Sequence, residues 1–236
     1  MGKNERIDKA SEIFKKISEP KLYHYNQKFR YLPNWLDNTS YYYQKEATKC
    51  LPQNYYYFKR GTVIRVNFGT NLGSEFSNIH FAIVLDKKDS PQKRTLTVLP
   101  LTSKQKSDRF SLGREVFNQT VTLLNTQVKH IDSQIKSMKG RIKEASQSTQ
   151  SLLQADYNQF EKDYNQLEKD FHALSRVLDI YKVYDKNSYV RVSDITTISK
   201  LRIERINRYD PSGKIRLSSQ QMALISQELM KLYLNK

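Results

Sequence analysis

The chain has 236 residues, with 38% hydrophobic and 27% charged side chains. This length is enough for one core of ordinary size plus an appendage. The formal net charge of +16 favours an anionic partner, such as a nucleic acid, an acidic protein or an anionic membrane face. Cys50 is the single cysteine, which excludes an intramolecular disulfide and a cysteine-based zinc site and fits a reducing cytosol.

No segment of about eighteen consecutive apolar residues occurs, as a membrane-spanning helix would require. The first sixteen residues, MGKNERIDKASEIFKK, contain no apolar run of the kind found in signal peptides. We therefore expect a cytoplasmic protein without a membrane segment.

Residues 1–57 are rich in tyrosine and predict a helical N-terminal extension. Apolar residues fall at helical spacing at Ile7, Ala10, Ile13, Phe14 and Ile17. Nine of the sixteen tyrosines lie in this segment, including the triplets 41–43 and 55–57. Exposed tyrosines can stack on nucleic-acid bases, but they also commonly cover one side of a neighbouring domain.

Residues 58–117 predict the first half of a small β-barrel. Strands are expected at 62–68, 80–85 and 95–101, where β-branched and apolar residues dominate. Turn signals separate them, with GTNLG at 69–73 and DSP at 89–91. Short strands with such spacing are typical of a small barrel.

Residues 118–180 predict a long antiparallel coiled-coil hairpin. Apolar residues alternate in steps of four and three, as in a coiled-coil seam. The first arm carries them at Leu124, Val128, Ile131, Ile135, Met138 and Ile142, and the second arm at Leu153, Tyr157, Phe160, Tyr164, Leu167, Phe171, Leu174 and Leu178. A polar stretch at 146–151 separates the arms, each of which would reach about 40 Å.

The positive charge is confined to the rest of the chain. Residues 118–180 contain eight basic and eight acidic side chains, whereas the net charge is +6 in residues 1–60, +4 in 61–117 and +6 in 181–236. A phosphate backbone is therefore expected to bind the globular part and not the hairpin.

Residues 181–236 predict the second half of the barrel and a C-terminal helix. Strands are expected at 188–192 and 200–206, followed by a turn at 210–213. Ser218 and Gln221 form a capping-box pattern, after which Met222, Ile225, Leu229 and Leu232 would be buried on one helix face. The fold class is therefore α+β, with a barrel interrupted by the hairpin.

Two blocks of the sequence resemble the PemK/MazF toxins. The first consists of KRGTVIRVNFG at 59–69, GSE at 73–75, HFAIVL at 80–85 and VLPLTS at 98–103. The second is SDITTISKLRI at 193–203, with the family's terminal helix matched by residues 218–234. The order of the motifs is that of the family, over about half of the chain.

The resemblance implies an SH3-like plasmid-maintenance-toxin barrel, usually a homodimer. It also implies an endoribonuclease that cuts single-stranded RNA without a metal or cofactor and is silenced by an antitoxin. In the family the neighbouring 2′-hydroxyl is the nucleophile, and a cyclic phosphate and a free 5′-hydroxyl are left.

His80 departs from the family pattern, which usually has an arginine followed by proline where this chain has His80-Phe81. A histidine can act as a base or an acid near neutral pH, whereas an arginine is a poor base. We therefore predict that His80 transfers a proton during RNA cleavage. The alternative is a histidine that caps a strand edge.

Three more residues are catalytic candidates. Thr102 aligns with the family's functional threonine, and its hydroxyl could bind the scissile phosphate or orient the attacking oxygen. Ser74 could bind phosphate, and Glu75 could orient His80 or serve as the base. The alternatives are an ordinary strand threonine and a solvent-exposed loop carboxylate.

Basic and polar residues flanking these motifs are candidates for RNA contact, namely Lys59, Arg60, Ser103, Lys104 and Lys106. Thr196 stands where the family often has arginine, so a second basic contact is expected to be missing. The histidines at positions 24, 80, 130 and 172 lack metal-ligand spacing, so no metal site is predicted.

Two other functions remain open from the sequence. The barrel could bind RNA or DNA without cutting it, or the coiled coil could be the working part of an assembly protein. The insertion could extend a dimer interface, bind an antitoxin, hold a regulatory partner or act as a spacer. The aromatic residues of its second arm exceed what a minimal two-helix seam needs.

Overall fold

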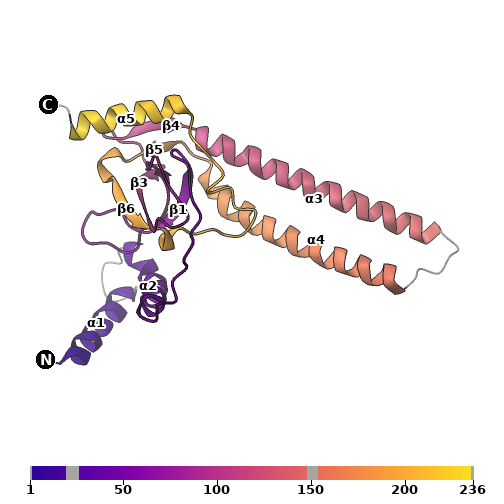
Figure 1. The fold of residues 1–236 in the computed structure, drawn as a ribbon, viewed down its shortest axis with the longest axis horizontal. Helices are drawn as coiled ribbons and strands as arrows, with labels where there is room; N and C mark the ends of the chain where they lie inside the picture. Colours follow the sequence, from indigo (N-terminus) through magenta and orange to yellow (C-terminus); the bar gives the residue numbers. More distant parts are fainter. Residues whose placement is uncertain (1, 20–26, 148–153, 235–236) are drawn as a thin grey trace.

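The computed structural model describes residues 2–19, 27–147 and 154–234. Its centre is an antiparallel sheet of β1 (Val63–Asn67), β2 (Ile79–Val84), β3 (Thr95–Thr102), β4 (Phe110–Gly113), β5 (Ser188–Val190) and β6 (Thr196–Ser199). The strand order is β1-β2-β3-β5-β4, and β6 also pairs with β3 (Figure 1). Strands drawn from both sides of the predicted insertion therefore share one sheet, as the α+β prediction requires.

The sheet does not close into a barrel by strand pairing among the described residues. Its edge at β1 meets residues 203–216 through the isolated bridges Val66↔Ile203 and Thr62↔Arg216, and through the Arg65–Glu204 ion pair at 3.0 Å. The strand predicted at 200–206 is wrong, because Lys200–Arg202 form the 3-10 turn η4. The side chain of Lys200 is turned inward to a buried ion pair with Asp89 at 2.7 Å.

Two apolar layers lie on opposite faces of the sheet. On one face, Ile83 and Leu99 pack with Met222 and Ile225 of helix α5 (Ser219–Tyr233). On the other face, Ile64, Ala82 and Val98 form a cluster with Phe58 and Phe68. This alternation follows from the two-residue period of a strand.

The capping box predicted at the start of the C-terminal helix is confirmed. The Gln221 backbone N–H donates to the Ser218 hydroxyl at 3.2 Å, and the Gln221 side chain accepts from the Ser218 backbone. The predicted burial of Leu232 is wrong, because 53% of its surface is exposed. It lies in the last turn of α5.

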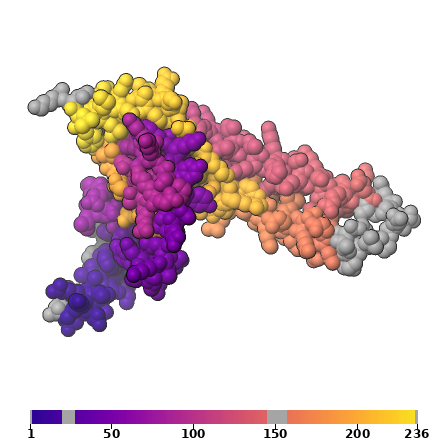
Figure 2. All heavy atoms as spheres, in the orientation of Figure 1, coloured from indigo at the N-terminus to yellow at the C-terminus, as the bar shows by residue number. Residues whose placement is uncertain are grey.

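The two long helices predicted for residues 118–180 are present as α3 (Glu115–Gln147) and α4 (Gln154–Tyr181). They run side by side away from the sheet as one projecting arm (Figures 1 and 2). The Arg141–Asp163 ion pair at 2.8 Å joins them far from the sheet. Leu153 and most of the predicted polar turn lie outside the described residues.

Of the predicted seam residues that the structure describes, three are buried, five are partly buried and five are exposed. Leu124, Ile131 and Leu174 are buried in a common cluster. The predicted burial is wrong for Val128, Ile142, Tyr157, Tyr164 and Phe171, which are all exposed. When α3 and α4 pack on each other, they bury one side of the apolar stripe of each helix and leave its other side exposed to solvent.

The N-terminal extension contains α1 (Lys3–Ser18), the 3-10 turn η1 (Gln27–Tyr31) and α2 (Leu32–Ala47), which confirms the helical prediction. Trp35 of α2 packs directly over Gly69 of the β1–β2 loop. Several tyrosines remain exposed, including Tyr43, Tyr56 and Tyr57, so these rings are only in part a cover for the sheet.

No helix in the described part of the chain is both long enough and apolar enough to cross a membrane.

Candidate active site

The site lies where β2 and β3 part. Their antiparallel pairing runs from Val84↔Val98 to Ala82↔Pro100 and stops there, although both strands continue. The Pro100 carbonyl accepts from the Arg191 N–H at 3.0 Å, so the backbone of Pro100 faces the β5 side of β3. Continuing the register by two residues places His80 opposite Thr102, so the two side chains emerge on the same face of the sheet.

A cavity of about 350 Å³ opens at this point. Its walls come from the start of β2, the end of β3 and the roots of both long helices. His80, Thr102, Ser103 and Lys104 all line it. The structure thus brings together two of the four catalytic candidates and two of the five candidates for RNA contact.

His80 is held neutral by its surroundings. Burial is the largest cause that lowers its pKa, to about 4, and the positive charges of Arg191 and Lys104 lower it further. A hydrogen bond with the Ser77 backbone acts in the opposite direction. The imidazole is therefore uncharged at neutral pH and has a nitrogen free of a proton to accept one.

Phe76 packs directly against the imidazole. Its ring lies 4.5 Å from the His80 ring and 5.0 Å from that of Phe68, centroid to centroid. The Arg191 guanidinium covers the Phe76 ring at 4.9 Å. His80 and Arg191 thus lie against one phenyl ring, and the Arg191 guanidinium also forms an ion pair with Asp194 at 2.5 Å.

The β1–β2 loop that carries Phe76 is fixed by its own polar groups. The Asn71 side-chain amide donates to the carbonyls of Phe68 at 3.0 Å and Phe76 at 2.7 Å. The Asn78 N–H donates to the Gly69 carbonyl at 2.7 Å. These bonds satisfy backbone groups that a strand would otherwise pair, so the loop can hold the ring in place.

The Thr102 hydroxyl points into the turn that follows β3. It accepts a hydrogen bond from the Lys104 backbone N–H at 3.2 Å, which brings the lysine back toward the cavity. Its own proton remains available to donate to a bound oxygen. Thr102 and Lys104 together offer a neutral donor and a cation to an anion in the cavity.

The other sequence candidates do not line this cavity. Ser74 and Glu75 are exposed on the β1–β2 loop, and the Glu75 N–H bonds back to the Leu72 carbonyl at 3.0 Å. Lys106 is exposed beyond the lining turn. Arg60, preceded by Lys59, lies at the opposite end of β2, where it donates to the Leu85 carbonyl and to the Ser226 hydroxyl.

Sequence reasoning missed Arg191, although a signal for it exists. Arg191 follows directly on β5, and its N–H donates to the Pro100 carbonyl at 3.0 Å. Once β5 is known to pair with the end of β3, the register brings Arg191 beside the residues around position 100. It provides a second positive charge near His80, in addition to Lys104, whereas the sequence, with Thr196 in place of an arginine, predicted that a second basic contact would be missing.

The roots of the long helices were also missed as part of the site. Phe117 and Thr120 of α3 line the cavity, as do Tyr184 and Lys186 after α4. Phe81 of β2 packs on Tyr181 and Tyr184, with ring centroids 5.7 and 4.9 Å away. Aromatic side chains therefore form one wall of the cavity, next to its polar residues, on the side where α3 and α4 join the sheet.

No group of three or more histidine, cysteine, aspartate or glutamate side chains among the described residues is placed to hold a metal ion. The chemistry available in the cavity is that of a neutral imidazole, hydroxyls and cations. Such a set can accept a proton and stabilise negative charge on an oxygen.

Comparison with protein families agrees with the sequence motifs. Residues 59–156 match the family described as PemK-like, MazF-like toxin of type II toxin-antitoxin system. The match contains β1, β2 and β3 with His80 and Thr102, whereas the second block of resemblance, at 188–234, lies outside it. No curated protein matches the chain. The chain is therefore similar to the PemK/MazF toxins over residues 59–156, which are less than half of its length.

Proposed function

We propose that this protein is an endoribonuclease toxin that cuts single-stranded RNA without a metal ion. The observation that supports this most directly is that His80 and Thr102 line one cavity, with Lys104 in its wall and Arg191 beside the imidazole. RNA carries its own nucleophile, so the protein needs only to move protons and stabilise charge.

In the proposed reaction, neutral His80 takes the proton of a 2′-hydroxyl. The 2′-oxygen attacks the adjacent phosphorus, the bond to the 5′-oxygen breaks, and a 2′,3′-cyclic phosphate forms. Thr102 and Lys104 donate to the phosphate oxygens as negative charge develops on them. The leaving 5′-oxygen gains a proton, a step to which we assign no described residue.

A bound phosphodiester would tune His80 for this role. A base works best when its pKa is near the working pH, and about 4 is low for that purpose. A phosphate anion in the cavity opposes the charges of Arg191 and Lys104 and raises the pKa of His80. Free enzyme would thus hold the imidazole neutral, and substrate would make it a better proton acceptor.

We further propose the following organisation from the similarity to the PemK/MazF toxins. Residues 58–117 and 181–236 form the toxin domain as a small barrel-like unit, residues 118–180 are an insertion, and residues 1–57 are an extension. An antitoxin protein would silence the site in the cytoplasm, and the toxin domain would form a homodimer. RNA contacts outside the cavity that holds His80 are assigned in this proposal to Ser74, Glu75, Lys59, Arg60 and Lys106.

The test is digestion of end-labelled single-stranded RNA by the purified chain in EDTA. Wild-type protein should produce cyclic-phosphate ends, and His80→Gln should cut at least about 10²-fold more slowly, which is the usual contribution of a general base. His130→Gln is the matched control, because His130 is exposed on α3, outside the cavity, and should have no effect. RNA with a 2′-deoxy sugar at the cut position should remain intact.

Two results would contradict the proposal in different ways. Tight RNA binding without any cut products would identify a non-catalytic nucleic-acid-binding module. Unchanged cutting by the His80→Gln variant would show that another group accepts the proton.

A further inference from the structure

The two long helices present an exposed apolar face that a simple spacer would not need. Their apolar residues form two lines, which alternate in steps of four and three along each helix. The inner line, Leu124, Ile131, Leu167 and Leu174, is buried or partly buried within the arm. The second line consists of Val128, Ile135, Ile142, Tyr157, Tyr164 and Phe171, and we call it the open line.

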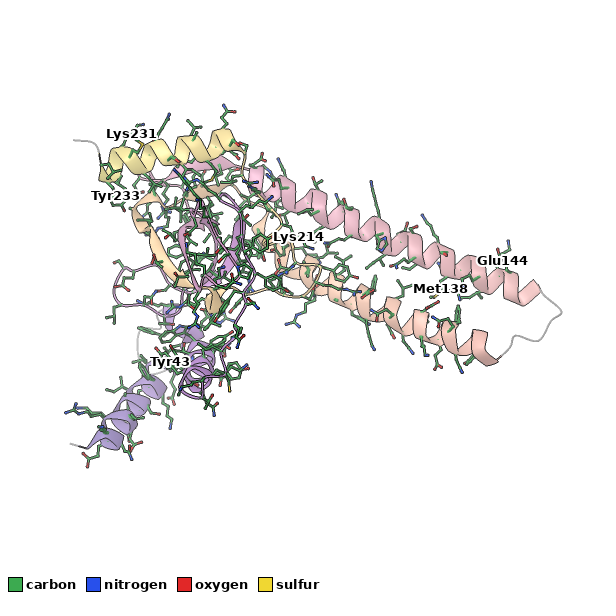
Figure 3. All side chains as sticks on the ribbon, viewed as in Figure 1. Tyr43, Met138, Glu144, Lys214, Lys231 and Tyr233 are labelled. Atoms are coloured by element: carbon green, nitrogen blue, oxygen red, sulfur yellow. The ribbon has the colours of Figure 1, made fainter. Side chains whose placement is uncertain are left out.

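Five of the six open-line residues are exposed, whereas Ile135 is partly buried against the cluster inside the arm. Ile142 is 50% exposed and Tyr164 51%, whereas Leu124 and Leu174 of the inner line are 5% and 4% exposed. On each helix an open-line residue precedes an inner-line residue by three positions, so the two lines lie about 60° apart around the helix. Figure 3 shows the inner-line position Met138 between the two helices and Glu144 on the outside of α3.

Both open lines lie on the same side of the arm. The two helices of an antiparallel pair are related by a twofold axis perpendicular to their length. Equivalent heptad positions of the two helices therefore lie on the same side of the pair. Residues 206–209 cover the other side, where Arg208 forms an ion pair with Asp170 and the Asn207 amide donates to the Ala173 carbonyl at 2.7 Å. The open lines of α3 and α4 therefore form one continuous apolar face.

The charges beside this face differ between the two helices. The positions one and four residues after the open line of α3 carry Lys129, Lys136, Lys139 and Lys143, together with one carboxylate, Asp132. The corresponding positions of α4 carry Glu161 and Glu168 and no basic residue apart from His172. The face is thus basic along α3 and acidic along α4.

We propose that a second copy of this chain packs on this face, so that α3 of each copy lies on α4 of the other. Such a pairing brings the basic edge of one copy onto the acidic edge of its partner, and it buries both open lines in a four-helix bundle. The arm is the one part of the chain with no net charge, so two arms can approach without the repulsion that +16 imposes elsewhere.

The charge pattern also fixes the direction of the pairing. Two arms that pack face to face with α3 on α4 are related by a twofold axis parallel to the arm, which places both tips at one end. The alternative axis, perpendicular to the arm, would place α3 on α3 and set lysines against lysines. Both toxin domains therefore lie at the same end of the bundle.

The test measures the distance between the two arm tips in the full-length chain. A Cys50→Ser, Glu144→Cys protein carries one spin label per copy, on the outer side of α3. Double electron–electron resonance should give a label-to-label distance within about 40 Å, because neighbouring helices in a bundle lie 8–10 Å apart. Light scattering should show a dimer in the same sample.

The decisive variant is Ile142→Lys together with Tyr164→Lys, which puts two charges on the apolar face. It should abolish the short distance while circular dichroism shows unchanged helix content. Ser137→Lys with Gln159→Lys is the matched control, because both residues are exposed two positions beyond the open line and away from the face. The control should keep the short distance.

Tip labels that stay far apart in the otherwise wild-type chain would overturn the proposal, even if the toxin domains associate. The apolar face would then be a binding site for a different helix, such as one from an antitoxin. A short distance that survives the Ile142→Lys, Tyr164→Lys substitution would overturn it as well. The result does not depend on RNA cleavage, so it separates this proposal from the proposed enzymatic function.

Discussion

His80 has its low pKa because burial and two cations disfavour its charged form. If neutral His80 is the base, kcat/KM for RNA should fall only as the pH drops toward about 4, and not near the ordinary value of 6.5. Arg191→Gln removes one cation, so the pKa of His80 rises. The fall of kcat/KM on the acid side of the pH profile then occurs at higher pH. Arg191→Lys keeps the charge and should keep this fall at the wild-type pH. If kcat/KM falls at the same pH whether or not residue 191 is charged, this account is wrong.

The same shift makes the free energy of unfolding depend on pH. Unfolded His80 binds a proton below about pH 6.5, whereas the folded side chain binds it only near pH 4. The unfolded state therefore takes up more protons in this window, and stability falls as the pH is lowered through it. Urea titrations should show a weaker acid destabilisation in His80→Gln than in His130→Gln.

Asp89 and Lys200 form an ion pair that is almost wholly buried, with side-chain exposures of 1% and 2%. Asp89 also accepts from the Phe58 N–H at 2.8 Å, and Lys200 donates to the Ser90 carbonyl at 3.0 Å. Asp89→Asn leaves the lysine charge without its partner and should cost about 3–5 kcal/mol of unfolding free energy. Glu228→Gln, which breaks the exposed pair with Lys231, should cost less than about 1 kcal/mol in the same urea titration. Equal losses in the two variants would contradict a large contribution of the buried Asp89–Lys200 pair to stability.

At the scale of elements, Gly69 connects the N-terminal extension to the sheet. Its φ is +86°, and a Cβ there would lie 2.7 Å from Cε2 of Trp35 in α2. Gly69→Ala should therefore displace α2 from the β1–β2 loop. Because Trp35 is the single tryptophan, its fluorescence should shift to longer wavelength as the ring becomes wetter. Gly73→Ala, with a φ of +49° and open space around it, should leave the spectrum unchanged.

The sequence predicts strands and helices well where the periodicity is long or the β-branched run is dense. The strands around 63–67, 79–84 and 95–102 and both long helices are examples. It fails at Lys200, because the partner that turns the side chain inward, Asp89, is 111 positions away. It also misses Arg191 and the aromatic wall of the cavity, because both depend on which strand β5 pairs with and on where the arm leaves the sheet. His80 and Thr102 could be found because the family motifs mark them without any knowledge of the register.

For the whole molecule, the separation of charge between arm and globular part predicts how RNA binding responds to salt. The slope of log affinity against log salt reports the number of phosphates that the protein neutralises. Residues 138–164 contain four basic and four acidic side chains, so replacing them with a Gly-Ser linker changes no net charge. The deletion also spares Phe117, Thr120, Tyr184 and Lys186 at the root, which line the cavity. RNA affinity and its salt slope should therefore remain those of the intact chain.

The matched comparison is a Lys104→Ala, Arg191→Ala chain with the arm intact. It loses two cations near the cavity and should show a shallower slope by between one and two, since each phosphate contact on a single strand contributes about 0.7. Filter binding of single-stranded RNA across a series of salt concentrations measures both. The opposite result would be a shallower salt slope in the chain with the shortened arm and an unchanged slope in the Lys104→Ala, Arg191→Ala chain. It would show that RNA binds the arm and not the cavity, which contradicts the proposed site.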